Sequence, residues 1–172
     1  MLSKQVEKVL NDQIRVEAES SQSYLSMASW AEVKGLEGIS NFMYKHSDEE
    51  RIHMLKLIKY VNERGGHAKI SELKAPKTEY DSFQKLFEEL YDHEIAVSES
   101  INRLVQVTLE EKDYATHNFL QWYVAEQIEE EALARTILDK INLIGNDKGG
   151  LYLFDRDVQQ ITAGSAANKP GP

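Results

Sequence analysis

The sequence predicts an all-α fold, a bundle of four long helices followed by a short fifth helix. Apolar residues recur at alternating spacings of three and four over long stretches, which is the period of a helix with one buried face. Prolines, which break helices, number only three, and two of them fall within the last four residues. No composition shift marks a second domain, so we expect one domain with a substantial core.

The first two helices are predicted over residues 4–33 and 37–64. Ser3 offers a cap for the first helix, whose buried face continues to Ala31 before Lys34 and Gly35 interrupt the pattern. The second helix stops at the pair of glycines 65–66, a common helix C-terminal signal.

Residues 66–80, which include Pro76, show no period and form a connection long enough to run the length of the bundle. The second and third helices should consequently be parallel neighbours. The third helix is expected to begin at Asp81, and Asp113 offers a cap for a fourth helix that ends at Gly145. One long crossover among three connections defines a known class of helix bundle.

The last part of the chain predicts a short amphipathic helix from Leu151 to Ile161. Such a helix is too short to be stable alone, so we expect it to pack between subunits. Residues 163–172 are expected to form a flexible tail, which leaves residues 1–162 as the folded domain.

Composition excludes several classes of function. The formal net charge of −9 disfavours nucleic-acid and anionic-membrane partners, since neither attracts an acidic surface. The absence of cysteine excludes disulfides, thiolate metal sites and cysteine nucleophiles. The first residues form no apolar signal segment, and no apolar run is long enough to cross a bilayer, so a cytoplasmic location is expected.

Acidic residues occupy positions in the buried stripes where apolar side chains belong. Each lies near the middle of its helix, so in a bundle they should converge at one depth. The spacing of the four stripes selects Glu17 in the first helix, Glu50 and His53 in the second, Glu94 in the third, and Gln127 and Glu130 in the fourth.

Clustered buried carboxylates indicate a bound metal. Burying ionised carboxylates side by side costs several kcal/mol each unless cations compensate for their charge. The alternative, a polar layer that only fixes helix register, lacks a core lysine or arginine as countercharge. Oxygen donors with one imidazole suit iron or manganese, with zinc as a competitor. Glu50 and His53 have the i, i+3 spacing that lets one helix face hold adjacent metals.

The segments 49–53 (EERIH) and 119–131 (FLQWYVAEQIEEE) resemble the prokaryotic non-haem ferritins, and the similarity extends over most of the chain. It implies a ferritin-like four-helix bundle with a di-iron centre in each subunit. By this resemblance the first iron is held by Glu17, Glu50 and His53, and the second by Glu50, Glu94 and Glu130, with Glu50 bridging. A third iron is implied at Glu49, Glu126, Glu129 and Glu130, Gln127 binds water at the second iron, and Tyr24 lies beside the centre.

The resemblance also implies a reaction. Paired Fe(II) is oxidised by dioxygen or H2O2, with Tyr24, Glu50 and Gln127 as candidate catalytic residues, and ferric mineral is stored inside a shell of about twenty-four identical subunits. Bacterioferritins differ by a second Glu-x-x-His in the fourth helix, where this chain has residues 126–129 (EQIE). Arg51 stands where their haem-binding methionine falls, so no haem is expected.

Three alternatives stay open on the residues. The bundle could be a scaffold that binds iron without oxidising it quickly, although that class would show a lost ligand. A di-iron oxygenase or peroxidase would usually carry the second Glu-x-x-His. The acids at 49, 126 and 129 could be solvated helix faces.

Some polar positions have no assigned role. His46 is either a neighbour of the metal ligands or an ordinary core residue. His67, His93 and His117 are expected to face solvent or a neighbouring subunit. His117 and Leu120 stand where many animal ferritins carry two channel acids, so the route of iron into the shell is not predicted.

Overall fold

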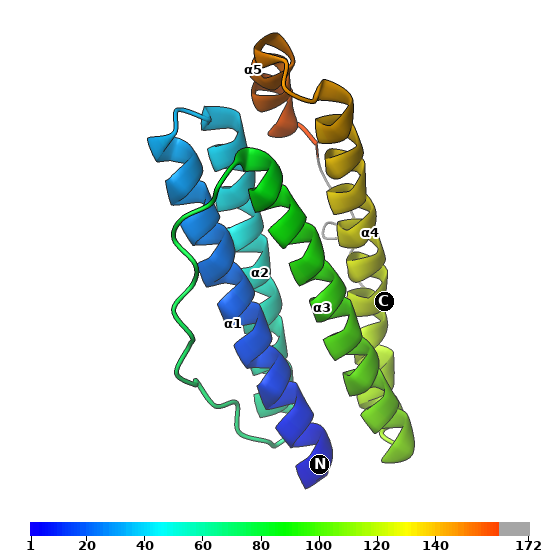
Figure 1. Ribbon diagram of the computed structural model, residues 1–172. Helices are drawn as coiled ribbons and strands as arrows, with labels where there is room; N and C mark the ends of the chain where they lie inside the picture. Colours follow the sequence, from blue (N-terminus) through cyan, green and yellow to red (C-terminus); the bar gives the residue numbers. More distant parts are fainter. Residues whose placement is uncertain (162–172) are drawn as a thin grey trace.

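The computed structural model describes residues 1–161 and, within them, consists of helices, turns and loops without a strand. The expected tail at residues 163–172 lies outside the described part. Figure 1 shows a bundle of four long helices with a short fifth helix at one end, which confirms the predicted fold class. The helices are α1 (Lys4–Val33), α2 (Glu37–Glu63), α3 (Phe83–Glu110), α4 (Tyr114–Ile144) and α5 (Lys148–Val158).

Side-chain caps explain where most of the helices begin. The Ser3 hydroxyl accepts a hydrogen bond from the backbone amide of Val6, as expected. Helix α3 begins at Phe83 rather than Asp81, because Ser82 is its cap. Helix α5 begins three residues before the expected Leu151, because the Asp147 carboxylate accepts from the third residue of the helix. The starts of α3 and α5 therefore differ from the prediction because of their capping residues.

The crossover over residues 65–82 runs along the whole bundle, so α2 and α3 point the same way, as predicted (Figure 1). The prediction that they are neighbours was wrong. Helix α3 packs against α1 and α4, and α1 packs against α2. Helices α2 and α3 are diagonal partners that meet only through large core side chains, such as Phe42 and Phe87, whose ring centroids are 5.9 Å apart.

The core consists of two apolar clusters separated by a polar layer. One cluster contains Tyr24, Phe42 and Phe87 near the α5 end, and the other contains Leu10, Leu57 and Ile101 near the opposite end. Between them lie buried polar side chains from all four long helices: Glu17, Ser20, His46, Ser47, Glu50, His53, Glu94, Gln127 and Glu130. The chain thus interrupts its own hydrophobic core at mid-bundle.

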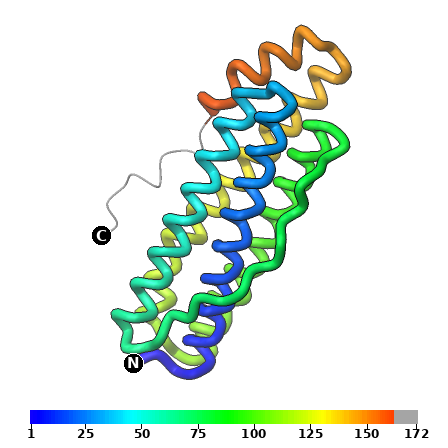
Figure 2. Tube along the Cα trace, turned by 90° about the vertical axis from the view of Figure 1, so that its left-hand side faces the viewer, coloured from blue at the N-terminus to red at the C-terminus, as the bar shows by residue number. Residues whose placement is uncertain are grey.

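Helix α5 lies across the end of the bundle (Figure 2). Its Phe154 and Val158 are buried against the same chain, and its expected packing between subunits stays a prediction. Its Asp155 carboxylate accepts a hydrogen bond of 2.9 Å from the backbone amide of Ile39, in the first turn of α2. Leu36, the residue before α2, supplies no side-chain cap, so Asp155 replaces it from a distant part of the chain.

None of the helices within residues 1–161 combines the length and apolarity needed for a bilayer crossing.

We expect Gly38→Ala to destabilise the protein. A Cβ at Gly38 would lie 1.6 Å from the backbone oxygen of Asp155, so α5 must shift and the Asp155 cap on α2 is lost. The cost should be about 1–3 kcal/mol, as for other overpacked sites, and thermal unfolding would measure it. Gly149→Ala is the matched control, because its Cβ would meet only ordinary contacts within α5. Equal melting temperatures for wild type and Gly38→Ala would contradict the packing described here.

Candidate metal centre

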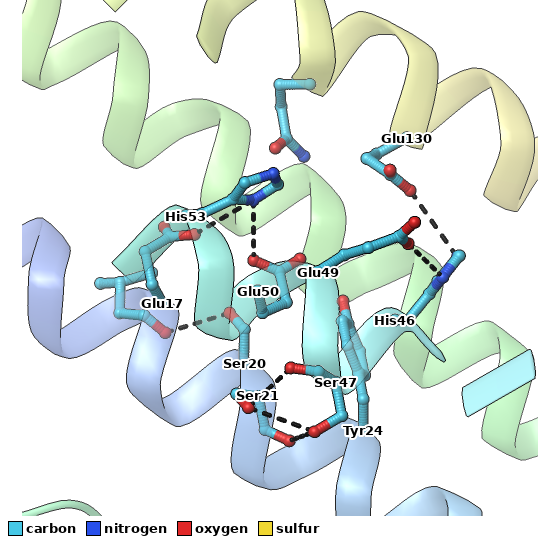
Figure 3. Close-up of polar contacts among 12 residues, drawn as sticks. Glu17, Ser20, Ser21, Tyr24, His46, Ser47, Glu49, Glu50, His53 and Glu130 are labelled. Carbon is cyan, nitrogen blue, oxygen red and sulfur yellow. Dashed lines mark hydrogen bonds and ion pairs between the residues drawn. The ribbon is translucent and has the colours of Figure 1, made fainter. Parts of the chain in front are cut away.

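Four helices contribute to the polar layer in the middle of the bundle. Figure 3 shows the side chains from α1 and α2 directed toward one another and toward Glu130 of α4. The six residues that the stripes selected are all buried, with at most 8% of any one exposed: Glu17, Glu50, His53, Glu94, Gln127 and Glu130. The predicted convergence at one depth is therefore present.

The tightest group is formed by Glu17, Glu50 and His53, whose potential ligand atoms lie within 4.8 Å of one another. His53 Nδ1 is 3.3 Å from Glu50 Oε2 and 3.7 Å from Glu17 Oε2. Gln13 donates a 2.7 Å hydrogen bond to the other oxygen of Glu17, and Glu17 Oε2 itself is buried without a hydrogen-bond partner. A buried carboxylate oxygen that lacks a donor is suited to a cation.

A second group surrounds Glu94 on α3. The Tyr24 hydroxyl donates to Glu94 Oε1, and Gln127 Nε2 donates to Glu94 Oε2 at 2.7 Å and to its backbone oxygen at 3.0 Å. Glu94 therefore faces the layer with both carboxylate oxygens held by neighbours. Together with Glu130 it reaches the region of Glu50, but within residues 1–161 these acids do not complete a second cluster as tight as the first.

His46, which sequence reasoning left unassigned, connects two of the acids. Its Nε2 lies 3.8 Å from Glu130 Oε2, and its Nδ1 lies 3.1 Å from Glu49 Oε2 (Figure 3). The imidazole also lies against the ring of Phe42, with centroids 4.1 Å apart. His46 thus links the centre to the acids expected to form a third iron site.

The outer acids, Glu49, Glu126 and Glu129, form a crowded group at the α2/α4 side of the centre. Glu126 is only 6% exposed, so the alternative of a solvated helix face does not hold for it. Burial raises the pKa of Glu126; His53 counteracts this, while the neighbouring Glu129 and Glu49 raise it further. An oxygen of Glu129 is buried without a hydrogen-bond partner. These acids lie close enough to repel one another.

Burial and mutual repulsion set the charges of the centre. Burial and the charge of Glu17 hold the pKa of Glu50 well above its usual range. Burial alone would also raise the pKa of Glu17, but its interactions with the neighbouring His53 and Glu50 outweigh it and lower that pKa. Burial disfavours protonated His53, yet the two carboxylates raise its pKa to about 11. Without metal, His53 is therefore the countercharge, a role that sequence reasoning had not considered.

Other residues around the centre were missed, although their spacing carried a signal. Gln13 and Tyr123 both fall on the buried stripes. Each lies four residues before a polar residue of the centre, Glu17 and Gln127 respectively. The Tyr123 hydroxyl is buried without a partner, and its ring lies 5.5 Å from that of His53. Polar residues at such positions can orient a metal ligand by hydrogen bonding to it.

The three peripheral histidines had been expected to face solvent or another subunit. His67 is exposed and His117 is half-buried. His93 is also half-buried; its Nε2 lies 2.8 Å from the Ser20 hydroxyl, and its ring meets the edge of Tyr24.

Comparisons with known proteins agree with this geometry. The model of the ferritin-like domain family matches residues 7–144. A probable bacterial non-heme ferritin-like protein of Haemophilus influenzae is 48% identical over 94% of this chain and 98% of its own length. A bacterial non-heme ferritin of Campylobacter jejuni is also 48% identical, over 94% and 96%. An open-pore ferritin structure from Archaeoglobus fulgidus superposes with a TM-score of 0.91 at 45% identity, covering 92% and 98% of the two chains.

The fold and the buried cluster define a four-helix protein with a carboxylate-rich site able to hold a metal. Together with the family match, they show that this chain belongs to the ferritin family, and that family supports a role in iron storage.

We expect metal binding at the centre to release protons and to weaken as the pH falls. Burial raises the pKa of Glu130 to about 7, with Glu94 adding to the effect and His46 opposing it. Glu130 is therefore largely protonated below pH 7, and His53 is protonated throughout the neutral pH range. A metal must displace these protons.

Zn(II) titration calorimetry in buffers of different ionisation enthalpy would count the protons. The affinity should rise between about pH 6 and 8 by roughly ten-fold or more per pH unit, since each proton released contributes a factor of ten. A pH-independent affinity would contradict these protonation states.

Proposed function

We propose that the protein is a ferroxidase that oxidises Fe(II) at a di-iron centre in the middle of its own bundle. The observation that supports this most directly is the buried cluster of Glu17, Glu50 and His53, in which one oxygen of Glu17 has no hydrogen-bond partner among residues 1–161. Oxygen ligands favour Fe(III) over Fe(II), and an imidazole with carboxylates suits iron better than it suits Ca²⁺ or Mg²⁺.

The proposed ligand sets follow the layer. The first iron takes Glu17, Glu50 and His53, and the second takes Glu50, Glu94 and Glu130. Glu50 bridges because it belongs to the tight cluster and lies near enough to Glu94 for that carboxylate to raise its pKa. Gln127 and Tyr24 hold Glu94 from two sides, so they act as positioning residues for the second iron. Gln127 also offers an amide to water there.

The reaction balances with either oxidant. Two Fe(II) ions give one electron each to dioxygen, which takes up two protons and becomes H2O2. With H2O2 as oxidant, the same two electrons and two protons give two molecules of water. The protein contributes by holding the ions side by side, and the protons that leave Glu50 and His53 on metal binding enter the medium rather than the reaction.

The outer acids Glu49, Glu126 and Glu129 are proposed to hold a third iron, together with Glu130. Their crowding, and the link that His46 makes between Glu49 and Glu130, support this proposal. We further propose that ferric iron is stored as mineral within a cytoplasmic shell of about twenty-four subunits. The likeness to ferritins over most of the chain supports that assembly.

A second candidate is a scaffold that binds iron without oxidising it quickly. The metal-free network around Glu94, in which Tyr24 and Gln127 occupy both carboxylate oxygens, is the observation in its favour. The ferroxidase and the scaffold differ in whether iron binds at the second position, beside Glu94 and Glu130.

Stopped-flow absorbance after mixing apo-protein with a few Fe(II) per subunit in aerobic buffer should show a fast ferric phase that saturates near two irons per subunit. Glu130→Ala should abolish that phase by emptying the second position, with helical content and assembly retained. Glu99→Ala is the control, because Glu99 is an exposed glutamate on α3. Slow, unsaturable oxidation by the wild type would favour the scaffold, and an unchanged rate in Glu130→Ala would refute the ligand assignment.

Glu129→Gln should separate the third iron from the pair. Removing its charge leaves the residues proposed for the first two irons intact, so the fast phase should keep its rate. The total of tightly bound Fe(II) under anaerobic conditions should fall by about one per subunit, because a third carboxylate site needs its charge. If the fast phase slows in parallel with the lost binding, the third site is not separate.

A further inference from the structure

A small hollow on the α3/α4 face reaches the wall of the proposed centre. Its volume is about 70 Å³, and it is lined by Ser98, Ile101, Asn102, Val124, Gln127, Ile128 and Glu131. None of these residues except Gln127 belongs to the ligand sets proposed above. The hollow therefore lies outside the centre but shares one residue with it.

Gln127 forms the partition between the hollow and the second iron position. The side chain is 6% exposed, and its nitrogen donates inward to Glu94. Among the hydrogen bonds of the described residues, only that nitrogen of the amide is used. Its oxygen remains available to a molecule in the hollow. A guest there is separated from Glu94 by a single amide group.

The size and lining of the hollow decide what kind of guest fits. The volume of about 70 Å³ is enough for a molecule of the size of one or two waters. The walls combine the apolar side chains of Ile101, Val124 and Ile128 with the hydroxyl of Ser98, which donates to the Glu131 carboxylate. A small uncharged molecule such as dioxygen or H2O2 fits this space.

The α2/α4 side of the centre has a different chemistry. Glu49, Glu126 and Glu129 gather at the α2/α4 side, where their negative charge attracts a cation. The two reactants of the proposed reaction thus find different surfaces. One carries three carboxylates, and the other is a small, mostly apolar hollow whose single carboxylate, that of Glu131, is held by Ser98.

We propose that the hollow between Ser98 and Gln127 is the port through which the oxidant, dioxygen or H2O2, reaches the second iron position. This rests on the proposed ferroxidase function. The port changes no bond; it admits a small uncharged oxygen species to the side of Glu94 opposite the Tyr24 hydroxyl.

Filling the hollow tests the proposal. Asn102 is exposed at its rim, so Asn102→Trp places a large side chain over the opening without disturbing the core. The rate constant for oxidation of pre-bound Fe(II) should fall about ten-fold at limiting oxidant, as expected for a blocked access step. Anaerobic binding of Co(II), read by its visible absorbance, should be unchanged. Asn118→Trp, the same substitution at an exposed position of α4 away from the hollow, should keep the wild-type rate.

The experiment is run separately with dioxygen and with H2O2, and a fall with either one supports the port and identifies the species that uses it. Unchanged rates with both oxidants, or an equal fall in Asn118→Trp, would overturn the proposal, as would loss of Co(II) binding in Asn102→Trp. If the wild type itself lacks the fast phase, it is the ferroxidase function that fails. A fast wild type with an unaffected Asn102→Trp refutes the port alone.

Discussion

The burial of several carboxylates in one layer is the constraint on which the rest of this structure depends. Water cannot solvate Glu17, Glu50 and Glu94 there, so the chain supplies other compensation. In the metal-free protein that compensation is protons on Glu50 and His53, together with hydrogen bonds from Gln13 and Tyr24. A bound metal would replace these protons by a stronger countercharge, so the layer that weakens the core is also suited to hold a metal.

Each helix carries a share of that layer, so the bundle geometry and the site cannot be separated. The apolar clusters on either side hold α1 to α4 at a common register, and that register brings between one and four polar residues from each helix into the layer. Substitutions far from the centre that shift one helix along its axis would therefore misalign the ligands before they unfold the protein.

The periodicity of the sequence was sufficient to predict the long helices and the positions of the buried acids, because both depend on spacing along one helix. It was insufficient for relations between helices. That α3 packs on α1 rather than on α2 depends on how four surfaces fit together. The positions of His46 and His93 likewise depend on partners from other helices, Glu130 and Ser20. The start of α5 was misplaced because the cap at Asp147 precedes its apolar residues.

The contact between Asp155 and the start of α2 joins α5 to α2. Helix α2 carries Glu50 and His53, yet the group that satisfies its first turn is encoded more than a hundred residues later. A ribosome adds about 5–20 residues per second, so several seconds pass between the synthesis of α2 and the synthesis of Asp155. During most of its synthesis the nascent chain therefore contains an α2 helix whose first turn lacks its cap. The polar layer can reach its final arrangement only after nearly the whole described domain has been made.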